Sequence, residues 1–280
     1  MVRNESPIGI FDSGVGGLSV LRAIRAALPD EALLYFADSR YAPYGKRDNA
    51  FITARMLGIV QWLEAQHVKA IVVACNTATV HTVSILRKRF QMPIIGVEPG
   101  IKPAALRSRT RVAGVLATAS TLKSVRFNTL LTQYGSDCRF ICQAGHDLVD
   151  DIESGDTDSP VVMRHLLARL QPILYASADT LVLGCTHYPF LLKAVHVLTD
   201  QQLKVIDTGE AIARQLMLRL TDQHLLIKPD PPVTQVESIF LPTPLRFVTT
   251  GDALQLTRMT WQLLGVNVAA EHVEIASDSG

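Results

Sequence analysis

Short runs of consecutive apolar residues recur along this chain of 280 residues, and each run ends in a polar or glycine-containing segment. Unbroken apolar runs are typical of parallel β-strands that are covered on both faces. The stretches between them have helical spacing, as between Leu18 and Leu28, where leucine and isoleucine recur every three or four residues. This alternation predicts an α/β fold with parallel sheets. The expected strands lie at 8–11, 33–36, 70–74, 93–97, 112–116, 139–142, 181–185, 204–209 and 245–249.

The first four expected strands and the next four carry matching features in the same order. The offset is 105 residues from Gly9 to Gly114 and from Tyr35 to Phe140, 110 from Cys75 to Cys185, and 109 from Glu98 to Asp207. Chance is the alternative, because any α/β chain offers many apolar runs, but a cysteine after the third strand of both sets favours an internal duplication. We therefore expect two pseudo-symmetric parallel-sheet domains with the active site in the cleft between them.

The end of the chain complicates the division into domains. A helix-like stretch at 210–220 is followed by a proline-punctuated segment at 228–244, which predicts an extended surface connection. A strand at 245–249 and a helix at 254–264 must then pack against earlier elements. We expect a discontinuous first domain of residues 1–97 plus 208–280, and a second domain of residues 98–207 inserted into it.

Composition excludes several classes of protein. Hydrophobic residues make up 48% and charged residues 19% of the chain, which excludes a disordered or fibrous protein. The 27 Lys and Arg against 26 Asp and Glu leave a net charge of +1, so nucleic acid is not an expected partner. The sequence opens without an apolar signal segment and no apolar run is long enough to span a bilayer. We expect a cytoplasmic protein with reduced cysteines and no membrane partner.

Two of the four cysteines lead into polar clusters at the ends of expected strands. The segments are Cys75-Asn76-Thr77 and Cys185-Thr186-His187. Ligands of open α/β sheets bind beyond the carboxyl ends of the strands. A lone buried cysteine is usually a packing residue. Two cysteines at equivalent places in a duplicated unit favour a catalytic role, because their thiols would approach a shared ligand from opposite sides.

Opposed thiols suit proton transfer at a stereocentre. A free thiol has a pKa of about 8.5, so one thiolate could remove an α-proton while the other thiol donates a proton to the opposite face, as in racemisation or epimerisation. Zinc on Cys75, Cys185 and His187 is one alternative, and acyl transfer with Cys185 as nucleophile and His187 as base is another. A module that binds an acidic amino acid without turnover is a third.

Cys138 and Cys142 have neither zinc nor redox spacing, and we interpret them as packing residues.

The segment from Asp12 to Ser19 predicts a glycine-rich turn after the first strand. Such a turn can present backbone N–H groups to an anion, and Asp38 stands about where a dinucleotide-binding unit has its ribose-binding acid. However, Ser19 occupies the third glycine position and Asp12 would lie beside a pyrophosphate. Nucleotide binding is therefore the weaker interpretation.

Several motifs together match a known family. They are Gly9-Ile10-Phe11-Asp12-Ser13-Gly14-Val15-Gly16-Gly17, Ala37-Asp38-Ser39, Pro43-Tyr44-Gly45, Ala74-Cys75-Asn76-Thr77-Ala78, Gly96-Val97-Glu98-Pro99 and Leu183-Gly184-Cys185-Thr186-His187-Tyr188-Pro189. With these motifs the chain resembles the cofactor-independent aspartate/glutamate racemase family, and within it the glutamate racemases, from about residue 8 to 265.

The resemblance implies roles for the matching residues. Cys75 would be the acid/base thiol that acts on D-glutamate and Cys185 the one that acts on L-glutamate, assisted by Asp12 and His187. Asp12 and Ser13 would hold the α-amino group, and the substrate would otherwise be bound by Pro43, Tyr44, Gly45, Asn76, Thr77, Thr118, Thr121, Thr186 and His187. The resemblance also implies a bacterial cytoplasmic enzyme that needs no cofactor or metal and supplies D-glutamate for peptidoglycan. Its partner is the small-molecule substrate glutamate, and a homodimer is left open.

The chain departs from the family pattern at three positions. Gln143 stands where the family usually has proline, Asp150 where it has glutamate eight residues after Cys142, and Phe127 where tyrosine is common. We expect these departures to affect how the second domain shapes the cleft.

Overall fold

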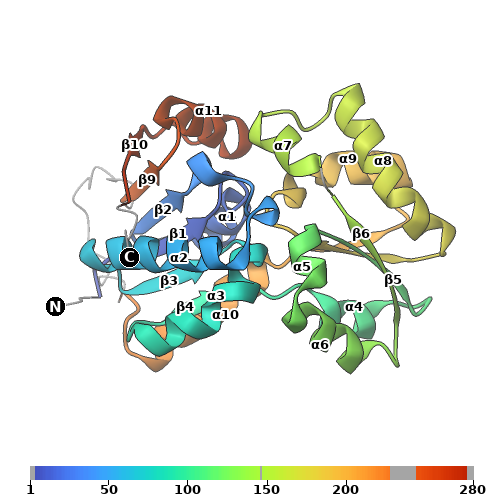
Figure 1. Cartoon of the computed structure of the whole chain (residues 1–280), viewed down its shortest axis with the longest axis horizontal. Helices are drawn as coiled ribbons and strands as arrows, with labels where there is room; N and C mark the ends of the chain where they lie inside the picture. Colours follow the sequence, from blue (N-terminus) through green and yellow to red (C-terminus); the bar gives the residue numbers. More distant parts are fainter. Residues whose placement is uncertain (1–3, 146, 228–243, 276–280) are drawn as a thin grey trace, which may run out of the picture.

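Two parallel β-sheets, each covered by helices, lie side by side in the computed structural model, which describes residues 4–145, 147–227 and 244–275 (Figure 1). Every strand pair in both sheets is parallel, which confirms the predicted α/β class. The first sheet has the order β10 (Ala270–His272), β9 (Leu245–Thr249), β2 (Leu33–Ala37), β1 (Ile8–Asp12), β3 (Ala70–Val73) and β4 (Ile94–Gly96). The second has the order β6 (Arg139–Ala144), β5 (Val112–Ala117), β7 (Thr180–Gly184) and β8 (Lys204–Ile206).

The two sheets repeat one strand order. The central order β2-β1-β3-β4 of the first sheet is matched by β6-β5-β7-β8 in the second. Gly9 of β1 pairs with Ile71 of β3, and Gly114 of β5 pairs with Leu181 of β7, so the offsets predicted from Gly9 and from Cys75 connect equivalent positions. The offset predicted from Tyr35 to Phe140 is wrong by two residues, because Gly9 pairs with Leu34 and Gly114 with Ile141. The pseudo-symmetry predicted from the sequence is confirmed.

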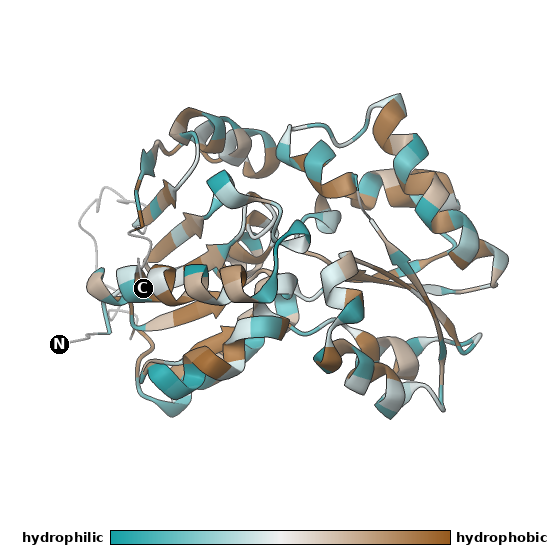
Figure 2. Ribbon diagram, in the orientation of Figure 1, coloured by the Kyte–Doolittle hydropathy of each residue, from teal (hydrophilic) through white to brown (hydrophobic). Residues whose placement is uncertain are grey.

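The helices follow the strands as the apolar spacing predicts. Figure 2 shows predominantly apolar strands in both sheets, while the helices also carry polar segments. Short 3-10 helices occur at η1 (Ser39–Tyr41), η2 (Tyr44–Lys46) and η3 (Tyr188–Leu191). The α-helices are α1 (Leu18–Ala27), α2 (Asn49–Ala65), α3 (Asn76–Arg89), α4 (Ile101–Arg107), α5 (Ala119–Lys123), α6 (Val125–Tyr134), α7 (Leu148–Glu153), α8 (Pro160–Tyr175), α9 (Leu192–Thr199), α10 (Gly209–Asp222) and α11 (Ala253–Leu264).

The end of the chain completes the first sheet. Strand β9 pairs with β2 and β10 pairs with β9, while α10 and α11 contact α1. We refer to the first sheet with α1, α2, α3, α10 and α11 as the first lobe, and to the second sheet with α4 to α9 as the second lobe. The domain boundaries expected at 97/98 and 207/208 stay a prediction, and most of the connection expected over 228–244 lies outside the described residues. Strand β10 was not expected, because residues 270–272 have no apolar run.

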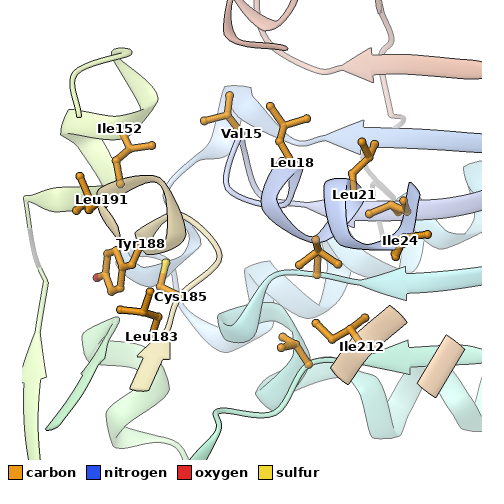
Figure 3. Close-up of a cluster of buried hydrophobic side chains, with 14 of the residues drawn as sticks. Val15, Leu18, Leu21, Ile24, Ile152, Leu183, Cys185, Tyr188, Leu191 and Ile212 are labelled. Atoms are coloured by element: carbon orange, nitrogen blue, oxygen red, sulfur yellow. The ribbon is translucent and has the colours of Figure 1, made fainter. Parts of the chain in front are cut away.

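One continuous cluster of buried apolar side chains joins the two lobes. In Figure 3, Leu18 and Leu21 of α1 lie on one side, while Tyr188 and Leu191 lie on the other, close to Cys185. All five side chains are buried. Because this cluster packs behind the turn that carries Cys185, the position of that turn is fixed by both lobes. No helix in the described part of the chain is long and apolar enough to cross a membrane.

Candidate active site

A small cavity of about 20 Å³ lies between the lobes, at the carboxyl ends of the central strands. Eleven of the thirteen residues expected at the site line it, and the other two, Asp12 and Thr121, hydrogen-bond to lining residues. A larger hollow of about 470 Å³ lies between α1 and α10, but Cys75 does not line it. The small cavity is therefore the one that both cysteines share. It is lined by Ser13, Pro43, Tyr44, Gly45, Cys75, Asn76, Thr77, Thr118, Val149, Cys185, Thr186 and His187.

Cys75 occupies the turn between β3 and α3 and caps the helix. Its Sγ accepts a hydrogen bond from the backbone N–H of Ala78 at 3.5 Å and lies 3.6 Å from Ser13 Oγ. Burial and the nearby Asp12 carboxylate raise the pKa of the Cys75 thiol to about 12. The environment therefore favours the neutral thiol, which is the form that can donate a proton.

Cys185 follows β7 and has a different environment. Its Sγ lies 3.6 Å from His187 Nδ1, and His187 Nε2 lies 2.6 Å from Glu153 Oε1. Although burial disfavours a charged imidazole, the hydrogen bonds to Cys185 and Glu153 raise the pKa of His187 well above its usual value. These hydrogen bonds favour a protonated imidazole beside Cys185, whereas a carboxylate lies near Cys75, so the two thiols have unlike electrostatic surroundings.

Asp12 ends β1 and is completely buried. Its Oδ1 accepts from Gly14 N at 3.0 Å, and its Oδ2 accepts from Thr186 Oγ1 at 2.9 Å. Burial raises the pKa of Asp12 to about 6, although the His187 charge and the two hydrogen bonds oppose the shift. Asp12 therefore connects the first lobe to the Cys185 turn and titrates near neutral pH, where general acids and bases are most effective.

Three threonine hydroxyls meet across the two lobes. Thr118 Oγ1 lies 2.9 Å from Thr77 Oγ1 and donates to Thr121 Oγ1 at 2.9 Å. Thr77 belongs to α3 in the first lobe, whereas the other two belong to the start of α5 in the second. Asn76, beside them, is buried, and its Oδ1 has no hydrogen-bond donor within the described ranges. Hydroxyl and amide groups of this kind can bind carboxylate and ammonium groups.

The glycine-rich turn accommodates protein side chains. Gly14 N is bound by Asp12, and Val15 N donates to Glu153 Oε1 at 2.8 Å. A Cβ atom on Gly14 would overlap Glu153, and one on Gly16 would overlap His187. The glycines are therefore required for the close approach of a carboxylate and an imidazole. Two of the turn's N–H groups are already used by protein carboxylates, so the nucleotide-binding interpretation has no support.

The zinc alternative requires one ligand set made of Cys75, Cys185 and His187. Within residues 4–145, 147–227 and 244–275, no three His, Cys, Asp or Glu side chains are grouped as a metal site. Both ring nitrogens of His187 already contact other side chains. This ligand set is therefore not assembled here. A nucleophile–base pair of Cys185 and His187 is geometrically available, but it gives Cys75 no role.

Comparison with known proteins agrees with this geometry. The family model described as Asp/Glu/Hydantoin racemase matches residues 8–216. The chain belongs to this family. Among curated relatives, it is 53% identical to the glutamate racemase of Cupriavidus pinatubonensis, with 97% of this chain and 96% of the relative covered. The predicted resemblance to glutamate racemases is confirmed, as is the prediction that the chain is a racemase.

Solved structures of glutamate racemases share the fold of this racemase-family chain over nearly its full length. The Francisella tularensis enzyme in complex with D-glutamate is 26% identical, with a TM-score of 0.82 and 98% of this chain and 99% of that chain covered. The Escherichia coli enzyme in complex with L-glutamate and the activator UDP-MurNAc-ala is 30% identical, with a TM-score of 0.82 and coverages of 97% and 99%.

The sequence did not predict that Glu153 is the carboxylate in contact with His187. The family spacing from Cys142 points to Asp150, but Asp150 forms an ion pair with Lys46 at 2.7 Å, and Glu153 is the residue that contacts His187. The two acids are three positions apart on α7, so they are neighbours on the surface of the helix. A search over one further helical turn would have found the glutamate.

The other two departures from the family pattern do not reach the cavity. Phe127 is buried in the apolar cluster of the second lobe, and Gln143 lies in β6, paired with Leu116. Val149 of α7, which the motifs did not indicate, contributes an apolar side chain to the cavity lining. The free cysteines Cys138 and Cys142 pack in or against the same apolar cluster as Phe127, as interpreted from their spacing.

Proposed function

We propose that this racemase interconverts L- and D-glutamate by proton transfer at the α-carbon between two cysteines. The observation that carries the proposal is that Cys75 and Cys185 line one small cavity from opposite lobes. One thiolate removes the α-proton from one face of the substrate and becomes a thiol. The other thiol gives its proton to the opposite face of the carbanion and becomes a thiolate. No atom other than hydrogen is transferred.

The environments of the two thiols suit opposite starting states. Burial near Asp12 favours the protonated form of Cys75, and His187 Nδ1, 3.6 Å from Cys185 Sγ, is placed to exchange a proton with Cys185. In this state the enzyme is prepared for L-glutamate, with Cys185 as the base and Cys75 as the acid. For D-glutamate the proton distribution is reversed, and Asp12 beside Cys75 then assists the first lobe's thiol.

The polar cavity lining suits the charged groups of glutamate. The hydroxyls of Thr77, Thr118 and Thr121 can donate to a carboxylate, as can the Thr186 hydroxyl. The unpaired Oδ1 of Asn76 can accept from the α-ammonium group, because a buried acceptor is rarely left without a donor. Ser13, together with the Pro43 to Gly45 loop, completes the wall.

Substrate access requires the lobes to separate. A cavity of about 20 Å³ holds about one water molecule and not an amino acid. The polar contacts that join the lobes include those between Thr77 and Thr118, between His81 and Ser120, and between Lys46 and Asp150. We infer that these contacts break when glutamate enters and form again during turnover, as lids of other enzymes do.

The biological role follows from the family resemblance. D-glutamate for peptidoglycan, made in a bacterial cytoplasm, is the role that we propose, and the bacterial sources of the relatives support it. The proposed partner is glutamate, the ligand of the structures cited above. Assembly as a homodimer stays a prediction.

The test is racemisation in D₂O. Purified protein is incubated with L-glutamate and separately with D-glutamate, without added cofactor, and optical rotation and the α-proton NMR signal are followed. Formation of the opposite enantiomer with deuterium at the α-carbon supports the proposal. Failure to racemise either enantiomer would refute it.

A further inference from the structure

A second cluster of buried polar side chains surrounds Asp38, at the carboxyl end of β2. Asp38 is completely buried. Its Oδ1 accepts from Arg55 Nη2 at 2.6 Å and from Thr250 Oγ1 at 2.7 Å, and its Oδ2 accepts from Arg55 Nε at 3.1 Å and from the Tyr44 hydroxyl at 2.6 Å. Four donors occupy this carboxylate, so it is not free to bind a ligand, and the ribose-binding role considered for Asp38 has no support.

Arg55 makes the cluster rigid. Its guanidinium binds Asp38 through two hydrogen bonds, and its Cζ lies 4.4 Å from the centroid of the Tyr41 ring. The residue is only 8% exposed. Two parallel bonds fix the relative orientation of both side chains, and loss of one partner would leave a buried charge without compensation. The pair therefore holds α2 against the carboxyl end of β2, an interior strand of the first sheet.

Tyr44 connects the Asp38–Arg55 ion pair to the cavity. Its side chain is buried, with the hydroxyl on Asp38 and the ring centroid 6.0 Å from that of Phe11. The same residue lines the cavity together with Pro43 and Gly45. A Cβ atom on Gly45 would lie only 3.2 Å from Thr118 Cβ, so this loop closely approaches the second lobe.

We propose that Asp38 and Arg55 are positioning residues, which hold the Pro43 to Gly45 loop at the wall of the substrate cavity through Tyr44. Pro43 follows the short 3-10 helix η1, and Tyr44 and Gly45 belong to the three-residue 3-10 helix η2, so little regular structure fixes the loop otherwise. The inference rests on the proposed function, because it treats the loop as part of a glutamate site. Neither residue lines the cavity, so their effect is on binding of the substrate and not on proton transfer.

The test uses Arg55→Lys together with the pair Thr250→Val and Thr250→Ser. Lysine keeps the charge but cannot form two parallel bonds, and valine removes the hydroxyl that donates to Asp38, while serine keeps it. KM and kcat are measured in both directions, and the Kd for D-glutamate is measured by calorimetry. We expect Arg55→Lys to raise KM and Kd about tenfold, the size expected for loss of one hydrogen bond to a charged group. Thr250→Val should raise both severalfold, Thr250→Ser should restore them, and kcat should stay within about threefold.

The matched control is a second buried ion pair on the same lobe. Lys69 and Glu31 form an ion pair, and their side chains are 0% and 3% exposed, but they lie before β3 and β2, at the amino ends of the strands. Glu31→Gln should lower stability without raising KM. If Arg55→Lys and Thr250→Val lower stability or kcat while KM and Kd stay within twofold, the positioning role is overturned. Failure of the proposed function is a separate outcome, in which the wild-type protein does not racemise glutamate.

Discussion

His187 Nε2 lies 2.6 Å from Glu153 Oε1, and the same oxygen accepts a hydrogen bond from the backbone N–H of Val15 at 2.8 Å. Glu153 belongs to α7 in the second lobe, whereas Val15 belongs to the glycine-rich turn of the first. The carboxylate that supports the Cys185–His187 pair is therefore bound to both lobes. The complete acid–base arrangement at Cys185 exists only when the lobes are together, which couples closure to catalysis.

Glu153→Gln should weaken proton transfer at Cys185. The substitution removes the negative charge that helps to raise the pKa of His187. The His187 pKa should fall, and the alkaline limb of the kcat profile should move to lower pH. We expect kcat to fall by about 10- to 100-fold, since general acid–base groups contribute about 10²- to 10⁴-fold in full. Asp150→Asn, on the same helix, should leave the pH profile in place. An unchanged profile for Glu153→Gln would contradict the role given to the carboxylate.

Asp12 should make folding stability depend on pH. The pKa of an unperturbed aspartate is 3.8, and that of Asp12 in the folded protein is about 6, so the folded state holds the proton more tightly. Stability contributed by the protonated form is present below pH 4 and is lost as the pH rises toward 6. The shift corresponds to about 3 kcal/mol. Urea unfolding at pH 4 and at pH 7 measures how much free energy of unfolding each protein loses between the two pH values. We expect this loss to be smaller in Asp12→Asn than in the wild type, by about 3 kcal/mol. An equal loss in both proteins would show that Asp12 does not titrate in this way.

Gly16→Ala should disturb the Cys185 turn. The new Cβ would overlap Nδ1 of His187 and lie 2.6 Å from Thr186 Oγ1. Both side chains belong to the cavity lining, so we expect activity to fall at least tenfold. Gly9→Ala is the control, because the nearest atoms to its Cβ would belong to the side chains of Leu63 and Val68, at 3.3 Å. Steady-state kinetics should show a much smaller change for the control, and equal effects would indicate general destabilisation.

Much of the fold could be predicted from the sequence because most of the strands contain a run of apolar residues. The offset between Cys75 and Cys185 identified equivalent positions, and the structure places both after the third strand of a repeated order. Strand β10 could not be predicted in this way. It is a three-residue edge strand whose residues are half-buried or exposed, so pairing with β9 and not burial defines it.

The candidate site was predictable where a motif fixes the local geometry. Residues such as Asn76 and Thr186 follow a cysteine directly, so a strand end brings them into the cavity. Counting from Cys142 indicates Asp150, whereas the glutamate that contacts His187 lies three residues further along α7, so the family spacing alone did not identify Glu153. The Asp38 cluster could not be predicted either, because two of its donors, Arg55 and Thr250, come from segments far apart in the sequence.

The most direct test of the two-thiol mechanism is α-proton exchange in variants that lack one of the two cavity cysteines. With Cys185 as the cavity's remaining cysteine, Cys75→Ala should exchange the α-proton of L-glutamate with solvent deuterium but form no D-glutamate. With Cys75 as the cavity's remaining cysteine, Cys185→Ala should exchange the α-proton of D-glutamate alone. NMR of each enantiomer in D₂O measures both outcomes. Full racemisation by either variant, or exchange of both enantiomers by one variant, would contradict proton transfer by two opposed thiols.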